Sequence, residues 1–398
     1  MKSTAIIVGG GVIGLSTAYH LSRKRFGKVI LLDKGPIGDG ASSRAAGNVQ
    51  NLVWHREGVQ TRLKGVELYR QLSEELDGYQ YHNVGCFNLW DRETWEKKQT
   101  LLPMYDEVGA AYEVFDGEEI HRRWPALQAL PEVVALHDPN GGYSEPHEYL
   151  PALANRIQQL GVDIREHQKV TGFLQRGGRI SGVTTTMGEV EADAVICTVH
   201  VWAVALLKQI GLSLPLKSFV HQRFLTTPVS WPVEFPVVGA YAFNESYMRP
   251  AFGNRILVGV STNHRREYPV RSTDFHMSML SCPDEVLHQR RSELTPLLPQ
   301  LADVTWEDQK VGLLCYSADY EPVLGPLAEL PGMFVATAFH SSGFAYNPIA
   351  GLLLAEYVAD GKTSINVNLF RPDRFDEKTA EKFVSSSLTQ SDIVSRRH

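Results

Sequence analysis

The sequence has 398 residues, of which 43% are hydrophobic and 21% charged, and its formal net charge at pH 7 is -6. This length is too great for one simple core and predicts two closely joined domains of an ordinary globular protein. The acidic balance argues against a nucleic acid as principal partner, and the four cysteines have neither the spacing of a zinc site nor that of a disulfide framework.

The chain opens on a predicted strand, turn, helix and second strand. Residues 5–8 are apolar and β-branched, which is typical of a buried parallel strand, and residues 15–24 and 28–32 are predicted as the helix and the next strand. Gly9 makes a tight turn, Gly11 lets the backbone approach a pyrophosphate, and Gly14 lets helix and strand pack closely. Asp33 follows Gly14 by 19 residues and can accept a hydrogen bond from a ribose hydroxyl. The unit therefore predicts a dinucleotide site.

Residues 35–48 form a predicted loop of small residues that contains Arg44. Small side chains let backbone N–H groups lie against a flat or charged ligand, and an arginine can pair with a phosphate. A mobile surface loop would have the same composition, so a ligand-binding role for this loop is indicated by the glycine turn before it rather than by its composition alone.

These motifs resemble the D-amino acid oxidase superfamily of FAD-dependent amine oxidoreductases, particularly its glycine oxidase and sarcosine oxidase branch. The resemblance implies non-covalently bound FAD in an α/β domain of the Rossmann-like, glutathione-reductase type. It also implies an α+β substrate domain with a large antiparallel sheet. We predict that residues 1–80, 140–215 and 316–398 form the FAD-binding domain and that residues 81–139 and 216–315 form the substrate domain.

The resemblance also implies cofactor contacts along much of the chain. The implied cofactor-binding residues are Gly9, Gly11, Val12, Ile13, Gly14, Asp33, Lys34, Ser42, Ser43, Arg44, Ala46, Gly47, Asn48, Val170, Thr198, Trp202, Gly343, Phe344 and Ala345. This chain departs from the family pattern at His200, which stands where the family has a glycine. A histidine in such a place is more often a hydrogen-bonded structural residue than a catalyst.

The middle of the chain alternates between predicted helices and strands. Residues 57–76, 93–108, 146–160 and 283–298 are predicted helices, with Ser144 as the N-cap of the third. Residues 220–225, 246–250 and 255–260 are predicted strands with no helix between them, which indicates an antiparallel sheet and hence the second domain. Such a sheet can cover one face of a flavin and present side chains to a substrate.

The last predicted unit is a strand, a glycine loop and a helix at residues 349–359, which again directs backbone N–H groups at a negative group. In the family this helix start lies beside the flavin pyrimidine ring. His340 matches the family's histidine before the loop. Cys315 lies near the position at which some sarcosine oxidases attach flavin through sulfur, so covalent attachment is a minor alternative.

The expected reaction is hydride transfer from a carbon beside nitrogen to flavin N5, which gives an imine that water hydrolyses. The expected substrate is a small amine or amino acid, N-methylated or D-configured. A 2-hydroxy acid dehydrogenase and a flavin-binding subunit of a larger amine dehydrogenase complex are the alternatives. The chain lacks the lysine with which the family promotes reaction with oxygen, so a quinone or a carrier protein stands beside O2 as the expected acceptor.

The substrate contacts are harder to predict. Sarcosine oxidases hold the substrate carboxylate with an arginine and a lysine, but by register this chain has Gln50 and Ala345 or Tyr346 at those places. Either Arg249, or after it Arg223, replaces these cations, or the substrate is not a simple amino acid.

The predicted catalytic residues are His340, Arg249, Tyr316 and Tyr247, and the predicted substrate-binding residues are Gln50, Arg249, Tyr247 and Tyr346, with Tyr241 as a further tyrosine of the pocket. No metal is expected. No uncharged apolar run approaches the roughly 20 residues that span a bilayer, and the scattered cysteines suit a reducing compartment. We expect a cytoplasmic protein, with peripheral membrane attachment and a homo- or hetero-oligomeric state left open.

Overall fold

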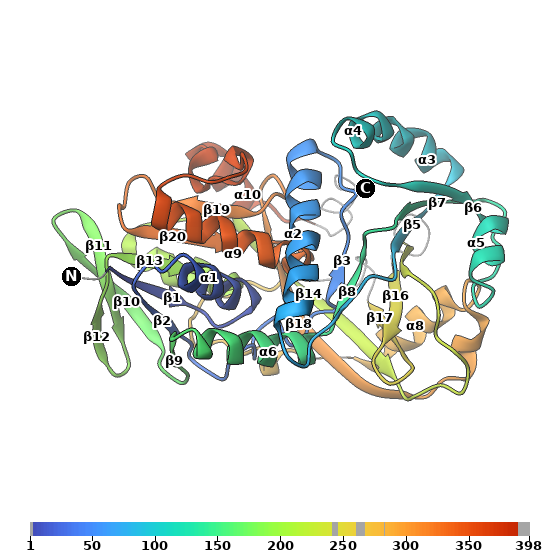
Figure 1. The fold of residues 1–398 in the computed structure, drawn as a ribbon, viewed down its shortest axis with the longest axis horizontal. Helices are drawn as coiled ribbons and strands as arrows, with labels where there is room; N and C mark the ends of the chain where they lie inside the picture. The colour runs from blue at the N-terminus through green and yellow to red at the C-terminus, as the bar shows by residue number, and fades with distance from the viewer. Residues whose placement is uncertain (1–2, 241–245, 260–266, 282, 389–398) are drawn as a thin grey trace.

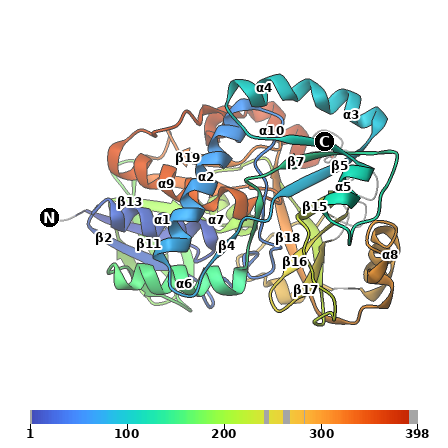
Figure 2. The ribbon, with the colours of Figure 1, turned by 45° about the vertical axis from the view of Figure 1, so that its right-hand side comes forward.

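Two sheets of different construction organise the computed structural model, which describes residues 3–240, 246–259, 267–281 and 283–388 (Figure 1). The long helix α2 (Arg56–Glu75) stands at the junction between them. Helices α1 (Val12–Arg23), α6 (Pro146–Gln159) and α9 (Gly343–Asp360) lie on the side of the smaller sheet. Helices α3 (Arg92–Lys98), α4 (Leu102–Glu107), α5 (Gly117–Arg123) and α8 (Asp284–Leu294) lie on the side of the larger one, and both views show this division (Figure 2).

The smaller sheet has six strands in the order β19-β20-β13-β1-β2-β9. Its strands are β19 (Val323–Pro326), β20 (Met333–Thr337), β13 (Ala194–Cys197), β1 (Thr4–Val8), β2 (Lys28–Leu32) and β9 (Asp163–Arg165). All neighbours are parallel except β19, which is antiparallel to β20. The expected parallel strand and its partner β2 are confirmed. The apolar run of β1 is explained by burial on both faces, since Ile7 packs against α1 and α9 while Ile6 packs against the opposite layer.

That opposite layer is a three-stranded antiparallel sheet together with a short helix. The elements are β10 (Val170–Arg176), β11 (Arg179–Thr185), β12 (Gly188–Glu191) and α7 (Ala203–Leu207). A further small sheet, β3-β8-β4, joins the loop after β2 to the start of α6. Its strands are β3 (Asn48–Val49), β8 (Gly142–Ser144) and β4 (Tyr81–His82).

The larger sheet has eight strands in the order β18-β14-β17-β16-β15-β5-β7-β6. They are β18 (Trp306–Ser317), β14 (Leu216–Thr226), β17 (Arg255–Gly259), β16 (Ser246–Ala251), β15 (Val237–Ala240), β5 (Cys86–Asp91), β7 (Val133–Asp138) and β6 (Glu113–Asp116). The sheet is antiparallel apart from the parallel pair β15 and β5, so the expected large antiparallel sheet is confirmed. Residue 260 of the expected third strand lies outside the described residues. The predicted domain boundaries stay a prediction, and β18 continues across the one placed after residue 315.

Three helix predictions were wrong in detail. The helix expected over residues 93–108 is broken by a 3-10 turn at residues 99–101, and α4 begins afresh with Pro103 in its first turn. Proline lacks an N–H and suits that position rather than a helix interior. Ser144 is not the N-cap of α6, because it belongs to β8, and Glu145 is the N-cap residue.

The helix expected over residues 349–359 starts earlier, at Gly343, and contains Pro348. Because Pro348 has no N–H, the carbonyl of Phe344 cannot make its usual bond within α9. Instead the Tyr69 hydroxyl of α2 donates to that carbonyl at 2.7 Å and Asn347 Nδ2 donates at 3.0 Å. The Tyr149 hydroxyl of α6 donates to Asn347 Oδ1 at 2.8 Å. Three helices are thus held together at the start of α9.

Among the described residues, no helix combines the length with the apolar composition that crossing a bilayer demands. The last helix is α10 (Glu377–Ser385), and residues 389–398 lie outside the described part.

We predict that Tyr69→Phe lowers the free energy of unfolding by about 1–2 kcal/mol, because a buried hydroxyl loses its bond to the Phe344 carbonyl. Urea unfolding followed by circular dichroism measures the change. Tyr357→Phe, on the same helix α9, is the matched control, since no hydrogen bond joins its hydroxyl to a described residue. Equal stability of the two variants would contradict the role of Tyr69.

Candidate active site

A cavity of about 430 Å³ is lined by residues from both ends of the chain and from both sheets. The predicted cofactor residues in its lining are Gly9, Gly11, Val12, Ile13, Asp33, Lys34, Ser42, Arg44, Ala46, Gly47, Asn48, Val170, Thr198, Trp202, Gly343, Phe344 and Ala345. Gly14 and Ser43 are not in the lining. Gly14 serves the close packing expected of it, since a Cβ there would lie 1.9 Å from the carbonyl oxygen of Gly9.

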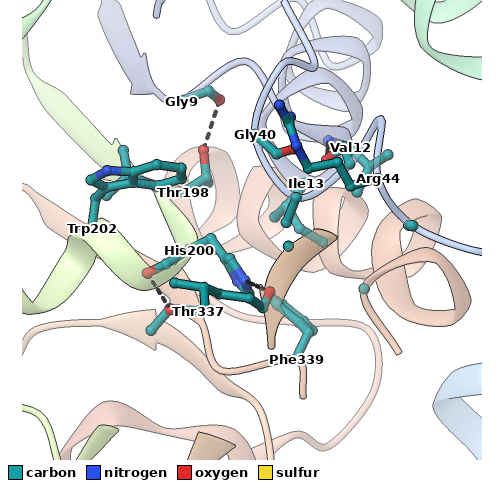
Figure 3. A pocket seen from close by; sticks show the side chains of 18 of the residues that line it. Gly9, Val12, Ile13, Gly40, Arg44, Thr198, His200, Trp202, Thr337 and Phe339 are labelled. Atoms are coloured by element: carbon teal, nitrogen blue, oxygen red, sulfur yellow. Dashed lines mark hydrogen bonds between the residues drawn. The ribbon is translucent and has the colours of Figure 1, made fainter. Parts of the chain in front are cut away.

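The glycine turn is held from two sides. Thr198 Oγ1 donates to the carbonyl of Val8 at 2.9 Å and to that of Gly9 at 3.0 Å, and Figure 3 draws the bond to Gly9. Gly9 adopts a φ of +107° that favours glycine. The carboxylate of Asp33 accepts from the N–H of Gly10 at 2.7 Å and from that of Gly35 at 2.9 Å. Burial raises the pKa of Asp33. Asp33 thus fixes the turn and also lies at the cavity wall, where a ribose would find an acceptor.

The cavity is open to the N-termini of α1 and α9, whose N-cap residues Gly11 and Ser342 make no side-chain cap. Val12 N–H donates to Ser42 Oγ at 3.1 Å, which ties the small-residue loop to the start of α1. Helix N-termini carry unpaired N–H groups and partial positive charge, which suit phosphate and an electron-rich ring. A Cβ at Gly11 would lie only 3.0 Å from Ser42 Oγ, so the start of α1 has room for backbone without a side chain at this position. These residues fit a dinucleotide such as FAD.

Arg44 and Lys34 lie in the lining with their charges partly engaged. Arg44 donates to the carbonyl of Asp39 and, at 2.8 Å, to that of Gly40, so it closes its own loop; its contact with a phosphate stays a prediction. Lys34 Nζ donates to the carbonyl of Phe275 at 2.6 Å and lies 4.4 Å from the Trp202 ring centroid. Burial lowers the pKa of Lys34 to about 8.

His200 takes over the position at which the family has glycine. Its φ of +51° lies in the left-handed region that glycine adopts without strain. Its Nε2 lies 2.9 Å from the carbonyl oxygen of Leu313, and its own carbonyl accepts from Thr337 Oγ1 at 2.9 Å (Figure 3). Burial lowers the pKa of His200, so the ring is neutral at pH 7. The residue joins the two sheets and still lines the cavity.

The wall formed by the larger sheet presents Tyr247 and His221, which both line the cavity. The Tyr247 hydroxyl lies 2.9 Å from His221 Nε2, and the two rings are stacked. Gly259 makes room for this tyrosine, because a Cβ there would lie 1.7 Å from Tyr247 Cζ. The sequence predicted Tyr247 as a site residue but not His221. The side of the sheet on which the His221 side chain lies depends on how β14 pairs with its neighbours.

His340 lines the cavity, but two of the predicted tyrosines do not. Tyr316 and Tyr346 are 1% and 2% exposed, and their ring centroids each lie 6.1 Å from that of His340. They therefore form a layer behind His340 rather than the cavity wall. Cys315 is also outside the lining and buried, which raises the pKa of its thiol to about 12 and disfavours covalent attachment of a flavin there. Tyr241 lies outside the described residues.

The prediction that Arg249 holds a substrate carboxylate is not supported by the geometry. Arg249 is fully buried and makes a bidentate ion pair with Glu145, with Nη1–Oε1 at 2.8 Å and Nη2–Oε2 at 3.1 Å. Its Nε donates to the carbonyl of Ala46 at 2.7 Å. Arg223, the second candidate, has its Nη1 3.6 Å from Asp308 Oδ2, and neither arginine lines the cavity. Arg249 is therefore fully engaged within the protein, whereas Arg223 lies outside the cavity wall with its Nε unpartnered among the described residues.

The sequence reasoning missed Arg62 of α2, which lines the cavity and is 2% exposed. Its Nη1 donates to the carbonyl of Gln50 at 2.7 Å, and its Cζ lies 4.6 Å from the Tyr346 ring centroid. A signal was present in the sequence: Arg62 falls between Val59 and Val66 on the buried stripe of the helix, where a solvated charge does not belong. Gln50 also lines the cavity, and its contact with a substrate stays a prediction.

Comparisons with known proteins agree with this geometry. The family model described as FAD dependent oxidoreductase matches residues 4–357. The chain is 29% identical over 379 residues to 4-methylaminobutanoate oxidase (formaldehyde-forming) from Paenarthrobacter nicotinovorans, covering 93% of this chain and 45% of that protein. Glycine oxidase from Pseudomonas putida is 26% identical over 398 residues, covering 94% of this chain and 99% of the oxidase.

Among solved structures, L-proline dehydrogenase from P. horikoshii superposes with a TM-score of 0.86 at 25% identity, covering 94% of this chain and 98% of the other. The chain spans about half the length of several curated relatives, including dimethylglycine dehydrogenase from Rattus norvegicus, of which it covers 47% at 24% identity.

We predict that Arg249→Met lowers the free energy of unfolding by about 3–5 kcal/mol, because it leaves the buried Glu145 carboxylate unpaired. Adding Glu145→Gln should recover a large part of this loss. Arg255→Met, which removes an exposed pair with Glu307, is the control and should cost less than about 1 kcal/mol. Chemical denaturation measures all three. A stable Arg249→Met protein with a raised KM alone would instead return Arg249 to the substrate.

Proposed function

The chain belongs to the FAD dependent oxidoreductase family, and on that premise we propose that it oxidises the carbon–nitrogen bond of a small amine or amino acid. The product would be an imine that water hydrolyses. The observation that carries the proposal is that helix starts from opposite ends of the chain, at Gly11 and Gly343, line one cavity whose other wall belongs to the eight-stranded sheet. This arrangement supports a cofactor held by backbone N–H groups and a substrate enclosed against it.

The residues divide into two groups by what they would do. The starts of α1 and α9, with Asp33, would hold FAD, and bound FAD supplies the hydride acceptor. On the substrate side, the hydrogen-bonded pair of His221 and Tyr247 can accept a proton from an ammonium group at the imidazole, so that the amine is neutral when its C–H bond breaks. His340 is 3% exposed and lines the cavity, where its ring would help to keep water from the reacting atoms.

The names of the relatives support an amino compound as substrate. 4-Methylaminobutanoate oxidase, glycine oxidase and L-proline dehydrogenase are all named for molecules with an amine beside a C–H bond and with a carboxylate. They include oxidases and dehydrogenases, so O2, a quinone or a carrier protein would serve as acceptor. The curated relatives that are twice as long carry further segments, and one match is a pyruvate dehydrogenase phosphatase regulatory subunit, which keeps a flavin-holding subunit as the second candidate.

We predict that the purified protein is yellow and releases its FAD on denaturation. Under anaerobic conditions, at least one of glycine, N-methylglycine, 4-methylaminobutanoate, L-proline and D-alanine should bleach the flavin, while lactate should not. Reoxidation by O2 or by a soluble quinone then identifies the acceptor. Bleaching by lactate alone would replace the proposal with oxidation of 2-hydroxy acids. A flavin that no compound of the panel reduces would favour the flavin-holding subunit.

A further inference from the structure

The ring of His200 has one nitrogen engaged and one open. Nε2 lies 2.9 Å from the carbonyl oxygen of Leu313, which belongs to β18 at the edge of the eight-stranded sheet. No hydrogen bond joins Nδ1 to another residue of the described chain, and Nδ1 keeps accessible surface. The residue is half-buried and lines the cavity, so the cavity is where Nδ1 can meet a ligand.

The bond to Leu313 decides which nitrogen of the ring carries the hydrogen. A carbonyl oxygen only accepts, so Nε2 donates, and a neutral imidazole with its hydrogen on Nε2 has a lone pair on Nδ1. Burial lowers the pKa of His200, which favours this neutral form at pH 7. His200 therefore offers the cavity a hydrogen-bond acceptor whose direction is fixed by the bond on the opposite side of the ring.

The backbone at this position suits a residue without a side chain. The φ of His200 is +51°, in the left-handed region that glycine adopts freely and other residues adopt at a cost. Strained residues of this kind cluster at ligand sites, where the contacts of the side chain offset the strain. The bond to Leu313 accounts for Nε2 and leaves Nδ1 to be explained.

His200 stands between the two helix starts that line the cavity. Thr198, two residues earlier, donates to the Gly9 carbonyl in the turn before α1, and the His200 carbonyl accepts from Thr337, which ends β20 before α9 (Figure 3). The start of α1 suits the pyrophosphate of FAD, and the start of α9 suits the electron-rich edge of its ring. The ribityl chain, which carries three hydroxyls, joins these two parts of FAD.

The chemistry of FAD indicates the same group. A lone pair needs a donor, whereas the phosphates have none and repel it by charge. The oxidised ring presents acceptors at N1, N5, O2 and O4, and its N–H at N3 lies on the edge that suits α9. The ribose hydroxyls and the adenine amino group belong to the end of FAD for which Asp33 is the expected acceptor. The ribityl hydroxyls are the donors that remain.

We propose that Nδ1 of His200 accepts a hydrogen bond from a ribityl hydroxyl of FAD. His200 is then a cofactor-binding residue particular to this chain, because a glycine at this position has no side chain with which to accept. The inference concerns how FAD is held, so it stands whether or not an amine is the substrate.

Two substitutions separate the two nitrogens. In His200→Asn, Oδ1 is bonded to Cγ as Nδ1 is, so the acceptor is kept and the donor to Leu313 is lost. In His200→Gln, the amide nitrogen can reach Leu313 and the acceptor on Cγ is lost. Titration of the apoprotein with FAD, followed by flavin fluorescence, gives each dissociation constant.

His200→Gln and His200→Gly should weaken FAD binding roughly 3- to 10-fold, as expected for one neutral hydrogen bond, and His200→Asn less than about 2-fold. Arg25 is the control for glycine at a left-handed position, because it is exposed, has a φ of +55° and lies outside the cavity lining. Arg25→Gly should bind FAD as the wild type does.

FAD analogues that lack one ribityl hydroxyl identify the partner. One of the 2′-, 3′- and 4′-deoxy analogues should bind the wild type and His200→Asn roughly 3- to 10-fold more weakly than FAD does. The same analogue should bind His200→Gly and His200→Gln as well as FAD does. A purely structural role would not give this pattern, because the bond to Leu313 involves no hydroxyl of the cofactor.

Two results would overturn the proposal. Weakened FAD binding in His200→Asn together with unchanged binding in His200→Gln would assign His200 to the joint between the two sheets. Deoxy analogues that lose the same affinity in the wild type and in His200→Gly would show that no ribityl hydroxyl depends on the histidine. Where both His200→Asn and His200→Gln bind FAD weakly, the pattern of the analogues decides.

Discussion

The buried ion pair between Arg249 and Glu145 is the constraint on which the cavity depends. Arg249 comes from β16 of the eight-stranded sheet, Glu145 is the N-cap residue of α6, and the Ala46 carbonyl that accepts from Arg249 Nε belongs to the small-residue loop. Burial alone would raise the pKa of Glu145, but the guanidinium of Arg249 holds this pKa below its ordinary value. Desolvation offsets most of the Coulombic attraction of such a pair, so its main effect is to fix position. The pair holds the eight-stranded sheet against the small-residue loop.

Two buried arginines of the chain differ in how their charges are compensated. Arg249 and Arg62 are both buried arginines beside an aromatic ring, Tyr143 in the first case and Tyr346 in the second. The first has a carboxylate from its own chain and is finished as a structural element. Within the described part of the chain, the second has the Tyr346 ring and the Gln50 carbonyl as its partners.

The sequence predicted those features that are encoded locally. The unit from β1 to Asp33 needs only a buried strand, three glycines and an acid at a fixed spacing, and the structure contains it with β2 at the predicted residues. The lining of the cavity on the side of the larger sheet was harder to predict, because it depends on which way side chains face after strands have paired. Tyr247 reaches the cavity across Gly259 of the next strand, and Tyr316 faces away into a layer of rings. Neither outcome follows from the order of residues along one strand.

The charge of the cavity follows from the same arrangement and bears on what it can hold. The chain carries a formal charge of -6, yet the described lining residues include four cations, Lys34, Arg44, Arg62 and Lys169, against two carboxylates, Asp33 and Asp39. The starts of α1 and α9 add partial positive charge to the same wall. A positive cavity in an acidic protein attracts anions to the place where they bind, while the net negative charge of the rest of the protein repels them. The pyrophosphate of a dinucleotide is such an anion, and the wall beside Asp33, where Lys34, Arg44 and Lys169 also lie, is the part of the cavity that suits it.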